Sequence, residues 1–153
     1  CFAALSDYPA QVLLAAGKRT NLADLEPIPE NFLVRNFVPQ LQVLERADLF
    51  VTHGGMNSVH EGLWYGVPLI AIPQQLEQAV VATQVERTGA GVALATRPPY
   101  GEVTAPELRA AVEKVLADRA THQAASKRLG DSLRAAGGAA RAADLILEFT
   151  ASE

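Results

Sequence analysis

Short apolar runs alternate with helical segments along most of this chain, and this alternation limits the possible folds more than any other feature. The runs are rich in Val, Leu, Ile and Phe, and several end at a glycine or a proline. They cover residues 11–16, 32–37, 48–52, 68–72 and 91–95, and we expect 48–52 and 68–72 to be buried strands. Helices are predicted between the later runs, over residues 40–47, 57–65 and 77–88, the first with Leu41 and Leu44 pointing inward. Continuous apolar strands separated by helices are typical of a parallel sheet, so we predict an α/β, Rossmann-like fold with helices on both faces.

The last third of the chain has a purely helical pattern. Thr104 and Glu107 have the spacing of a capping box, in which each side chain satisfies a free backbone donor at the start of a helix. Two further helices are predicted over residues 123–136 and 139–149, separated by two glycines. No residue pattern there indicates chemistry, so we expect these helices to close the side of the sheet.

Size and composition indicate one domain over residues 1–153. The chain has 153 residues and is 49% hydrophobic, which is enough for a core. No apolar run is long enough to cross a bilayer and no signal peptide is visible, so we expect a cytoplasmic protein without a membrane segment. Cys1 is the only cysteine, which excludes a disulfide framework and a cysteine metal site. Because residues 1–5 look like the middle of a helix, we expect a piece of a longer protein; a processed or tagged start is the alternative.

The charge distribution indicates how an anion would be bound. The net charge is −4, with 13 basic and 17 acidic residues, and residues 1–78 carry four of the basic and eight of the acidic ones. An acidic half argues against nucleic acid as a partner. An anion bound in this half would be held mainly by backbone N–H groups.

The segment from Thr52 to Ser58 fits a diphosphate. A predicted strand ends there, two glycines follow, and a helix starts near Asn57. A helix N-terminus presents unsatisfied N–H groups, and Gly55 lets a phosphate approach the backbone. Asn57, Ser58 and His53 could donate further hydrogen bonds. The alternative is a plain strand–turn–helix in which Asn57 is the N-cap and His53 is a core residue.

Polar residues on the following helices fit hydroxyl groups. Glu61 shares a helical face with Asn57 and Ser58, where a carboxylate could accept hydrogen bonds from a ribose. Glu77 and Gln78 pair an acid with an amide at a helix start, a combination suited to adjacent sugar hydroxyls. Each acid also has an ordinary interpretation, since helices favour acids in their first turn.

Two residues that precede the segment from Thr52 to Ser58 could bind a nucleobase. Phe37 and Gln40 flank a Val-Pro pair, so Phe37 could stack on a nucleobase with Gln40 near the base or ribose; core packing and a solvated helix start are the alternatives. We expect Lys18 and Arg19 to form a solvated loop pair. Trp64 and Tyr65 are expected to pack their helix against the sheet. The chain has no glycine-rich dinucleotide fingerprint, no ATP-type phosphate loop and no Asp-x-Asp metal motif.

Four motifs in order resemble the signature of family 1 UDP-glycosyltransferases, in particular the bacterial macrolide-glycosyltransferase-like subgroup. They are Phe-Val-Pro-Gln at 37–40, Thr-His-Gly-Gly-Met-Asn-Ser-Val-His-Glu at 52–61, Gly-Val-Pro at 66–68 and Pro-Gln-Gln-Leu-Glu-Gln at 73–78. The resemblance implies the C-terminal half of a GT-B glycosyltransferase, the domain that binds the UDP-sugar donor. It places Phe37 against uracil and Gln40 at the base or ribose. The remaining donor-binding residues would be His53, Gly55, Asn57 and Ser58 at the diphosphate, Glu61 at the ribose, and Glu77 and Gln78 at the transferred sugar.

The resemblance also implies what the chain lacks. In the family the reaction inverts the anomeric centre without a metal or other cofactor, and a histidine of the N-terminal acceptor domain is the base. No residue here matches that base, so we expect no catalytic residue in this chain and no sugar transfer by it alone. The acceptor implied is a small hydrophobic molecule such as a macrolide, flavonoid or terpenoid.

The chain also differs from the family at the first strand of the domain. In the strand order 3-2-1-4-5-6 that strand is central, and it has no counterpart here, so we expect two exposed ladder edges.

Two other functions stay open. One is the donor domain of another GT-B enzyme, an N-acetylglucosaminyltransferase or a UDP-sugar epimerase. The other is a non-catalytic nucleotide-sugar-binding subunit that needs a partner chain.

Overall fold

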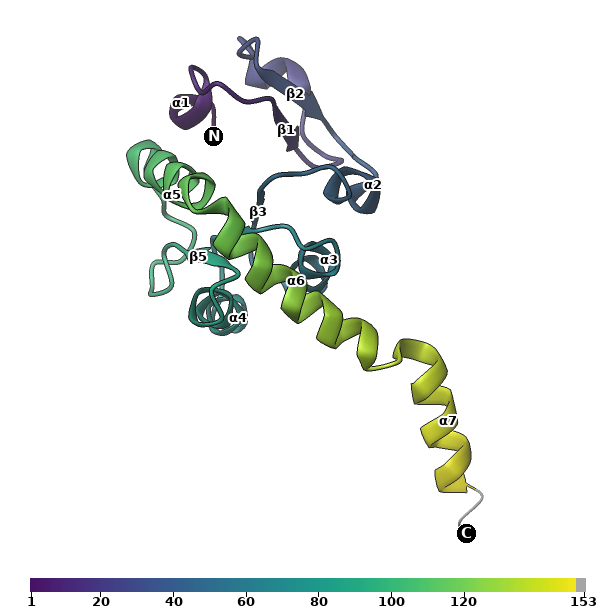
Figure 1. The fold of residues 1–153 in the computed structure, drawn as a ribbon. Helices are drawn as coiled ribbons and strands as arrows, with labels where there is room; N and C mark the ends of the chain where they lie inside the picture. The colour runs from purple at the N-terminus through teal and green to yellow at the C-terminus, as the bar shows by residue number, and fades with distance from the viewer. Residues whose placement is uncertain (151–153) are drawn as a thin grey trace.

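A computed structural model describes residues 1–150 and shows two parallel sheets with helices packed around them (Figure 1). The smaller sheet pairs β1 (Val12–Ala15) with β2 (Phe32–Arg35), in a register that sets Val12 opposite Phe32. The larger sheet has the order β3 (Phe50–Thr52), β4 (Leu69–Ala71) and β5 (Gly91–Ala93). All five strands fall inside the predicted apolar runs. The α/β class with parallel strands is therefore confirmed, although the strands form two sheets rather than one.

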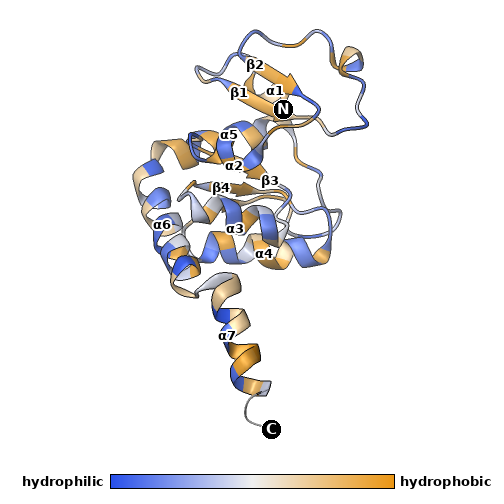
Figure 2. Cartoon of the chain, turned by 90° about the vertical axis from the view of Figure 1, so that its right-hand side faces the viewer, coloured by the Kyte–Doolittle hydropathy of each residue, from blue (hydrophilic) through white to orange (hydrophobic). Residues whose placement is uncertain are grey.

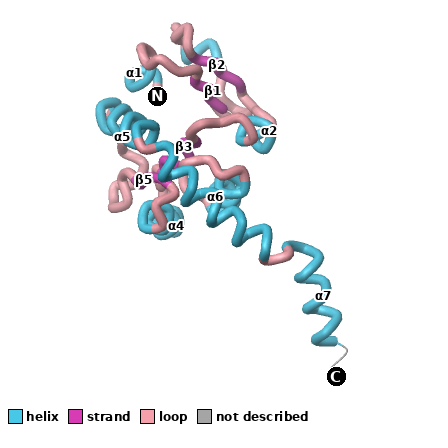
Figure 3. Tube along the Cα trace, in the orientation of Figure 1, coloured by secondary structure: helices cyan, strands magenta, loops and turns pink. Residues whose placement is uncertain are grey.

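The helices also lie close to their predicted positions (Figure 3). They are α1 (Phe2–Leu5), α2 (Gln40–Leu44), α3 (Met56–Trp64), α4 (Leu76–Arg87), α5 (Ala105–Ala117), α6 (Arg119–Ala135) and α7 (Gly138–Thr150), with a 3-10 turn at Leu22–Leu25. The chain leaves α3 and α4 through Gly66 and Gly89, whose φ angles of 68° and 76° favour glycine. Glycine therefore ends both helices where the sequence predicts an end.

The larger sheet is buried at its centre and open at one edge. Leu69, Ile70 and Ala71 of β4 have no exposed surface, as predicted for a strand covered on both faces. Val51 of β3 is 38% exposed, so the prediction of a wholly buried strand over residues 48–52 was wrong. The reason is that β3 pairs with β4 alone among the described strands.

The two sheets share a hydrophobic core although no strand ladder joins them. Phe32 and Val34 of β2 belong to the same buried cluster as Ile70 and Val92 of the larger sheet. The cluster also contains Ala4 and Leu5 of α1 and four residues of α5: Leu108, Ala111, Val112 and Val115. Contacts between α1 and α5 therefore bridge the gap between the sheets.

The C-terminal helices behave differently from one another. Helix α6 packs against α3, and a Cβ built on Gly130 would meet the carbonyl group of Leu63. Helix α7 extends away from the rest of the chain, and none of its residues is buried (Figure 2). The prediction that residues 139–149 close the side of the sheet was therefore wrong. Within residues 1–150, no helix combines the length and hydrophobicity that crossing a bilayer requires.

Two further side chains differ from expectation. Leu41, predicted to point inward, is 49% exposed, whereas Leu44 is buried as predicted. Trp64 is 46% exposed and lies under the Arg134 guanidinium, 5.2 Å from its ring centre, rather than against the sheet. Arg134 also donates to the Trp64 carbonyl oxygen, so this corner is held by α6.

Replacing Thr104 by alanine is expected to destabilise the fold by about 1 kcal/mol, because the capping box at the start of α5 is present. The hydrogen bonds from the Thr104 hydroxyl and N–H hold the pKa of Glu107 below its usual value of 4.5. Glu107 therefore stabilises the fold above that value, and this contribution is lost as the pH falls. Thermal unfolding at pH 7 and pH 3 checks this, since the difference between the wild type and the variant should shrink at the lower pH.

Candidate functional site

The centre of the candidate site is the glycine turn between β3 and α3. Gly54 adopts a φ of 82°, and a Cβ there would lie 3.2 Å from the carbonyl oxygen of Gln78. The turn therefore fits closely against the first turn of α4. Glycine is required at this position both for its conformation and for the close approach.

Helix α3 begins at this turn with its first N–H groups uncovered. Gly55 is the N-cap, and no side chain caps this end. Asn57 is the second residue of the helix, so the alternative that made it the N-cap was wrong. Since the first N–H groups of a helix have no intrahelical partner, they are available to an anion.

His53 lies across the same turn. A Cβ on Gly55 would collide with Nε2 of the His53 ring, which means that the ring occupies the space a larger residue would need. His53 and Asn57 are exposed, and Ser58 is partly buried. The alternative that placed His53 in the core was therefore wrong.

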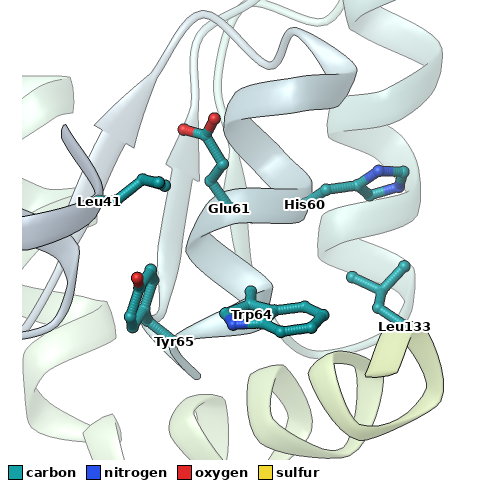
Figure 4. Close-up of a pocket in the computed structure, with 6 residues that line it drawn as sticks. All are labelled: Leu41, His60, Glu61, Trp64, Tyr65 and Leu133. Carbon is teal, nitrogen blue, oxygen red and sulfur yellow. The ribbon is translucent and has the colours of Figure 1, made fainter. Parts of the chain in front are cut away.

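Glu61 lies on the next turn of α3 and is held by Gln40. The amide Nε2 of Gln40 donates to Oε2 of Glu61 over 2.5 Å, which joins α2 to α3. The Glu61 carboxylate points away from the rings of Trp64 and Tyr65 (Figure 4). These residues, with Leu41, His60 and Leu133, line a hollow of about 430 Å³. A carboxylate has four acceptor positions, so Glu61 keeps the capacity to accept hydrogen bonds from hydroxyl groups.

The start of α4 places Glu77 and Gln78 on the far side of the glycine turn. Oε1 of Gln78 accepts a hydrogen bond from the backbone N–H of Gln74 over 2.8 Å, which leaves the amide hydrogens of Gln78 as possible donors. Glu77 is exposed and accepts a bond from Gln75 over 3.2 Å. The contact between Gly54 and Gln78 brings these two residues beside the segment from His53 to Ser58.

Phe37 follows β2 and is 68% exposed, so the core-packing alternative for this residue was wrong. Nζ of Lys18 lies 5.5 Å from the centre of its ring. We expected Lys18 to be only a solvated loop residue and did not predict this contact. The contact joins loops that follow two different strands. No local sequence signal indicates it.

The described residues offer no obvious metal site. Within residues 1–150 there is no group of three or more His, Cys, Asp or Glu side chains that could hold a metal ion. The polar groups gathered around the glycine turn are hydrogen-bond donors and acceptors: backbone N–H groups, an imidazole, amides and carboxylates. Such a set can bind an anion next to hydroxyl groups.

Comparison with known protein families identifies the chain. The model of the erythromycin biosynthesis protein CIII-like C-terminal domain matches residues 1–145. The chain belongs to this family. Its resemblance to macrolide-type glycosyltransferases is thereby confirmed, and the EryCIII-like match extends over β1 to β5 and most of α7.

Individual relatives agree with the EryCIII-like assignment. The chain is 45% identical over 148 residues to an uncharacterized UDP-glucosyltransferase, YojK of Bacillus subtilis, covering 97% of this chain and 35% of the relative. The structure of the glycotransferase of kitacinnamycin superimposes with a TM-score of 0.85 at 39% identity, covering 97% of this chain and 37% of that one. The structure of glycosyltransferase VinC in complex with dTDP gives a TM-score of 0.73 at 25% identity, with 84% and 31% covered.

These matches define the fold and show how much of its relatives the chain spans. The chain has the α/β fold of the C-terminal half of GT-B glycosyltransferases, as predicted. It spans about a third of the length of the relatives that it matches.

Proposed function

We propose that residues 1–153 bind the UDP-hexose donor of an inverting, metal-independent glycosyltransferase whose acceptor is a small hydrophobic molecule. The observation that carries the proposal is the uncapped N-terminus of α3 at a glycine turn, one helical turn before a carboxylate that Gln40 holds in place. This arrangement sets donors for a diphosphate next to an acceptor for ribose hydroxyls.

The diphosphate would lie at the start of α3. Backbone N–H groups of the first turn, with His53, Gly55, Asn57 and Ser58, supply its hydrogen bonds. Residues 1–78 have twice as many acidic as basic residues, so the helix dipole and the N–H groups, rather than a cationic cluster, would offset its charge. The same fixed dipoles would stabilise the charge that develops on the departing UDP.

The two ends of the donor would be bound by side chains on either side of the turn. Glu61 would accept from the ribose hydroxyls, and Phe37 would stack on the uracil ring. Gln40 would act through Glu61, by holding its carboxylate in place. This role replaces the direct contact with the base or ribose that the resemblance implies. Glu77 and Gln78 would bind the hexose, because their helix starts beside the glycine turn.

The arrangement of the sheets supports a further proposal about the domain. Among the described strands β1 pairs with β2 alone and β3 with β4 alone. A parallel strand between β1 and β3 would join the two sheets into the order 3-2-1-4-5-6, and we propose that the parent protein supplies it together with an N-terminal acceptor domain. That domain would provide the catalytic base, so this chain alone would transfer no sugar. Turnover of UDP-glucose onto a phenolic acceptor by the isolated chain would contradict this part.

Calorimetric titration of the chain with UDP, UDP-glucose and dTDP-glucose, with ADP as control, tests the function. We expect UDP and UDP-glucose to bind with dissociation constants from micromolar to millimolar, about −8 to −4 kcal/mol. Binding of dTDP-glucose with equal strength would shift the donor class towards thymidine nucleotides, for which VinC offers a precedent. Absence of binding for all three diphosphates would refute the proposal.

Replacing Gln78 by alanine is expected to weaken UDP-glucose binding by about tenfold and UDP binding by much less, because Gln78 would contact the hexose alone. Gln84→Ala, on an exposed part of the same helix, is the matched control. The titrations above provide the measurement. Equal losses for UDP and UDP-glucose would reject a role for Gln78 in reading the sugar.

A further inference from the structure

We propose that Lys18 belongs to the nucleotide site and selects bases that present carbonyl oxygens; this inference rests on the proposed function. Lys18 and Phe37 lie in loops that leave the carboxyl ends of β1 and β2. Since these strands are parallel and adjacent, both loops emerge at the same edge of the sheet. This is the edge at which ligands bind in open α/β sheets.

The backbone of the Lys18 turn is tied to the segment that carries Phe37. Nδ2 of Asn36 donates to the carbonyl oxygens of Gly17, over 3.0 Å, and Thr20, over 2.6 Å. The Thr20 hydroxyl in turn donates to the Ala16 carbonyl oxygen over 2.6 Å. The turn on both sides of Lys18 is therefore fixed by Asn36, the residue that directly precedes Phe37. The backbone thus holds the side chains of Lys18 and Phe37 near each other, in addition to their rotamers.

The Lys18 ammonium is available for a ligand. It lies 5.5 Å from the centre of an aromatic ring that is itself 68% exposed, and it forms no ion pair within residues 1–150. A base stacked on Phe37 would lie within reach of this ammonium, because lysine has a flexible four-carbon stem. Asn36 would then be a positioning residue that holds the turn.

The chemistry of the ammonium determines which bases it favours. Lysine is a donor only, so it stabilises a base edge with carbonyl oxygens and gains nothing from an exocyclic amino group. Uracil and thymine carry two carbonyl oxygens, whereas adenine carries none: its acceptors are ring nitrogens, and the one on its pairing edge lies beside the exocyclic amino group. Lys18 would therefore favour UDP and dTDP over ADP.

Titration of the Lys18→Met variant with UDP and ADP tests the inference. Methionine keeps much of the apolar stem and removes the charge. We expect UDP affinity to fall about tenfold and ADP affinity to change by less than about twofold, while Lys18→Arg keeps the preference for UDP. Arg46→Met removes one positive charge from the same acidic half at another position and should leave the ratio of the two affinities unchanged.

The outcomes separate this inference from the function on which it depends. If the wild-type chain binds no diphosphate nucleotide, the proposed function fails. If the wild type binds UDP but Lys18→Met weakens UDP and ADP equally, Lys18 acts only by general attraction to the diphosphate and the inference is overturned. Unchanged or tighter UDP binding by Lys18→Met would also overturn it, since Lys18 would then merely cover the Phe37 ring.

Discussion

Replacing Glu61 by alanine is expected to weaken UDP binding ten- to hundredfold. Glu61 follows the uncapped start of α3 by one turn, and its carboxylate is held by Gln40. Hydrogen bonds between hydroxyl groups and a carboxylate contribute about 1.5–3 kcal/mol, and each 1.4 kcal/mol corresponds to about a tenfold change in affinity. Calorimetry with UDP measures the loss directly.

The ribose itself provides a control for Glu61. The Glu61→Ala variant should lose less affinity for 2′-deoxy-UDP than for UDP, because one of the hydroxyls that Glu61 would bind is already missing. Glu86→Ala removes an exposed carboxylate from α4 and should leave both affinities unchanged. Unchanged UDP affinity in Glu61→Ala, or an equal loss for both nucleotides, would remove Glu61 from the proposed ribose site.

Gln40 should prove to act through Glu61. Its Nε2 donates to the carboxylate, so Gln40→Ala should weaken UDP binding when Glu61 is present and have little further effect in the Glu61→Ala background. A double-mutant cycle with UDP measures this coupling. Additive losses would instead favour direct contact between Gln40 and the nucleotide.

Replacing Gly130 by valine is expected to lower stability by about 3 kcal/mol, at the upper end of the cost of overpacking. A Cβ on Gly130 would meet the carbonyl of Leu63, with its carbon only 3.0 Å away, and then the Cα of Trp64 at 3.4 Å. These are backbone atoms, which cannot rotate aside as a flexible side chain can. Helices α3 and α6 would have to separate, which would also open the small core around Leu63 and Val59.

Thermal unfolding checks the Gly130 prediction. For a chain of this size the loss corresponds to a fall in the melting temperature of about 6–12 °C. Gly130→Ala should lose less, since alanine is favoured over glycine in a helix by about 1 kcal/mol. Ala124→Val, at an exposed position of the same helix, is the matched control and should change stability by less than about 1 kcal/mol. A melting temperature for Gly130→Val equal to that of this control would show that α3 and α6 do not depend on the close contact.

Local patterns were enough to predict most of the elements. Alternating apolar runs located all five strands, and Thr104 with Glu107 located the start of α5. These features depend on residues that are neighbours in sequence or one helical turn apart. The glycine turn between β3 and α3 was predicted on the same grounds, although the N-cap proved to be Gly55 rather than Asn57.

Contacts between distant segments could not be predicted in this way. The bond from Gln40 to Glu61 crosses 21 positions, and the contact of Lys18 with Phe37 joins two loops. Nothing near Lys18 in the sequence marks it, since a lysine after a strand is usually solvated. The exposure of Trp64 likewise depends on Arg134, which lies on another helix 70 positions away.

The amino-acid sequence was sufficient to specify a parallel α/β domain, the order of its elements and the glycine turn that begins α3, because backbone preference and apolar periodicity are local properties. Folding in three dimensions settled which side chains meet: Gln40 with Glu61, Lys18 with Phe37, and Gly130 with the backbone of α3. It also directed α7 away from the core. These outcomes depend on how whole elements pack against one another, and the spacing of residues along a chain carries no record of that packing.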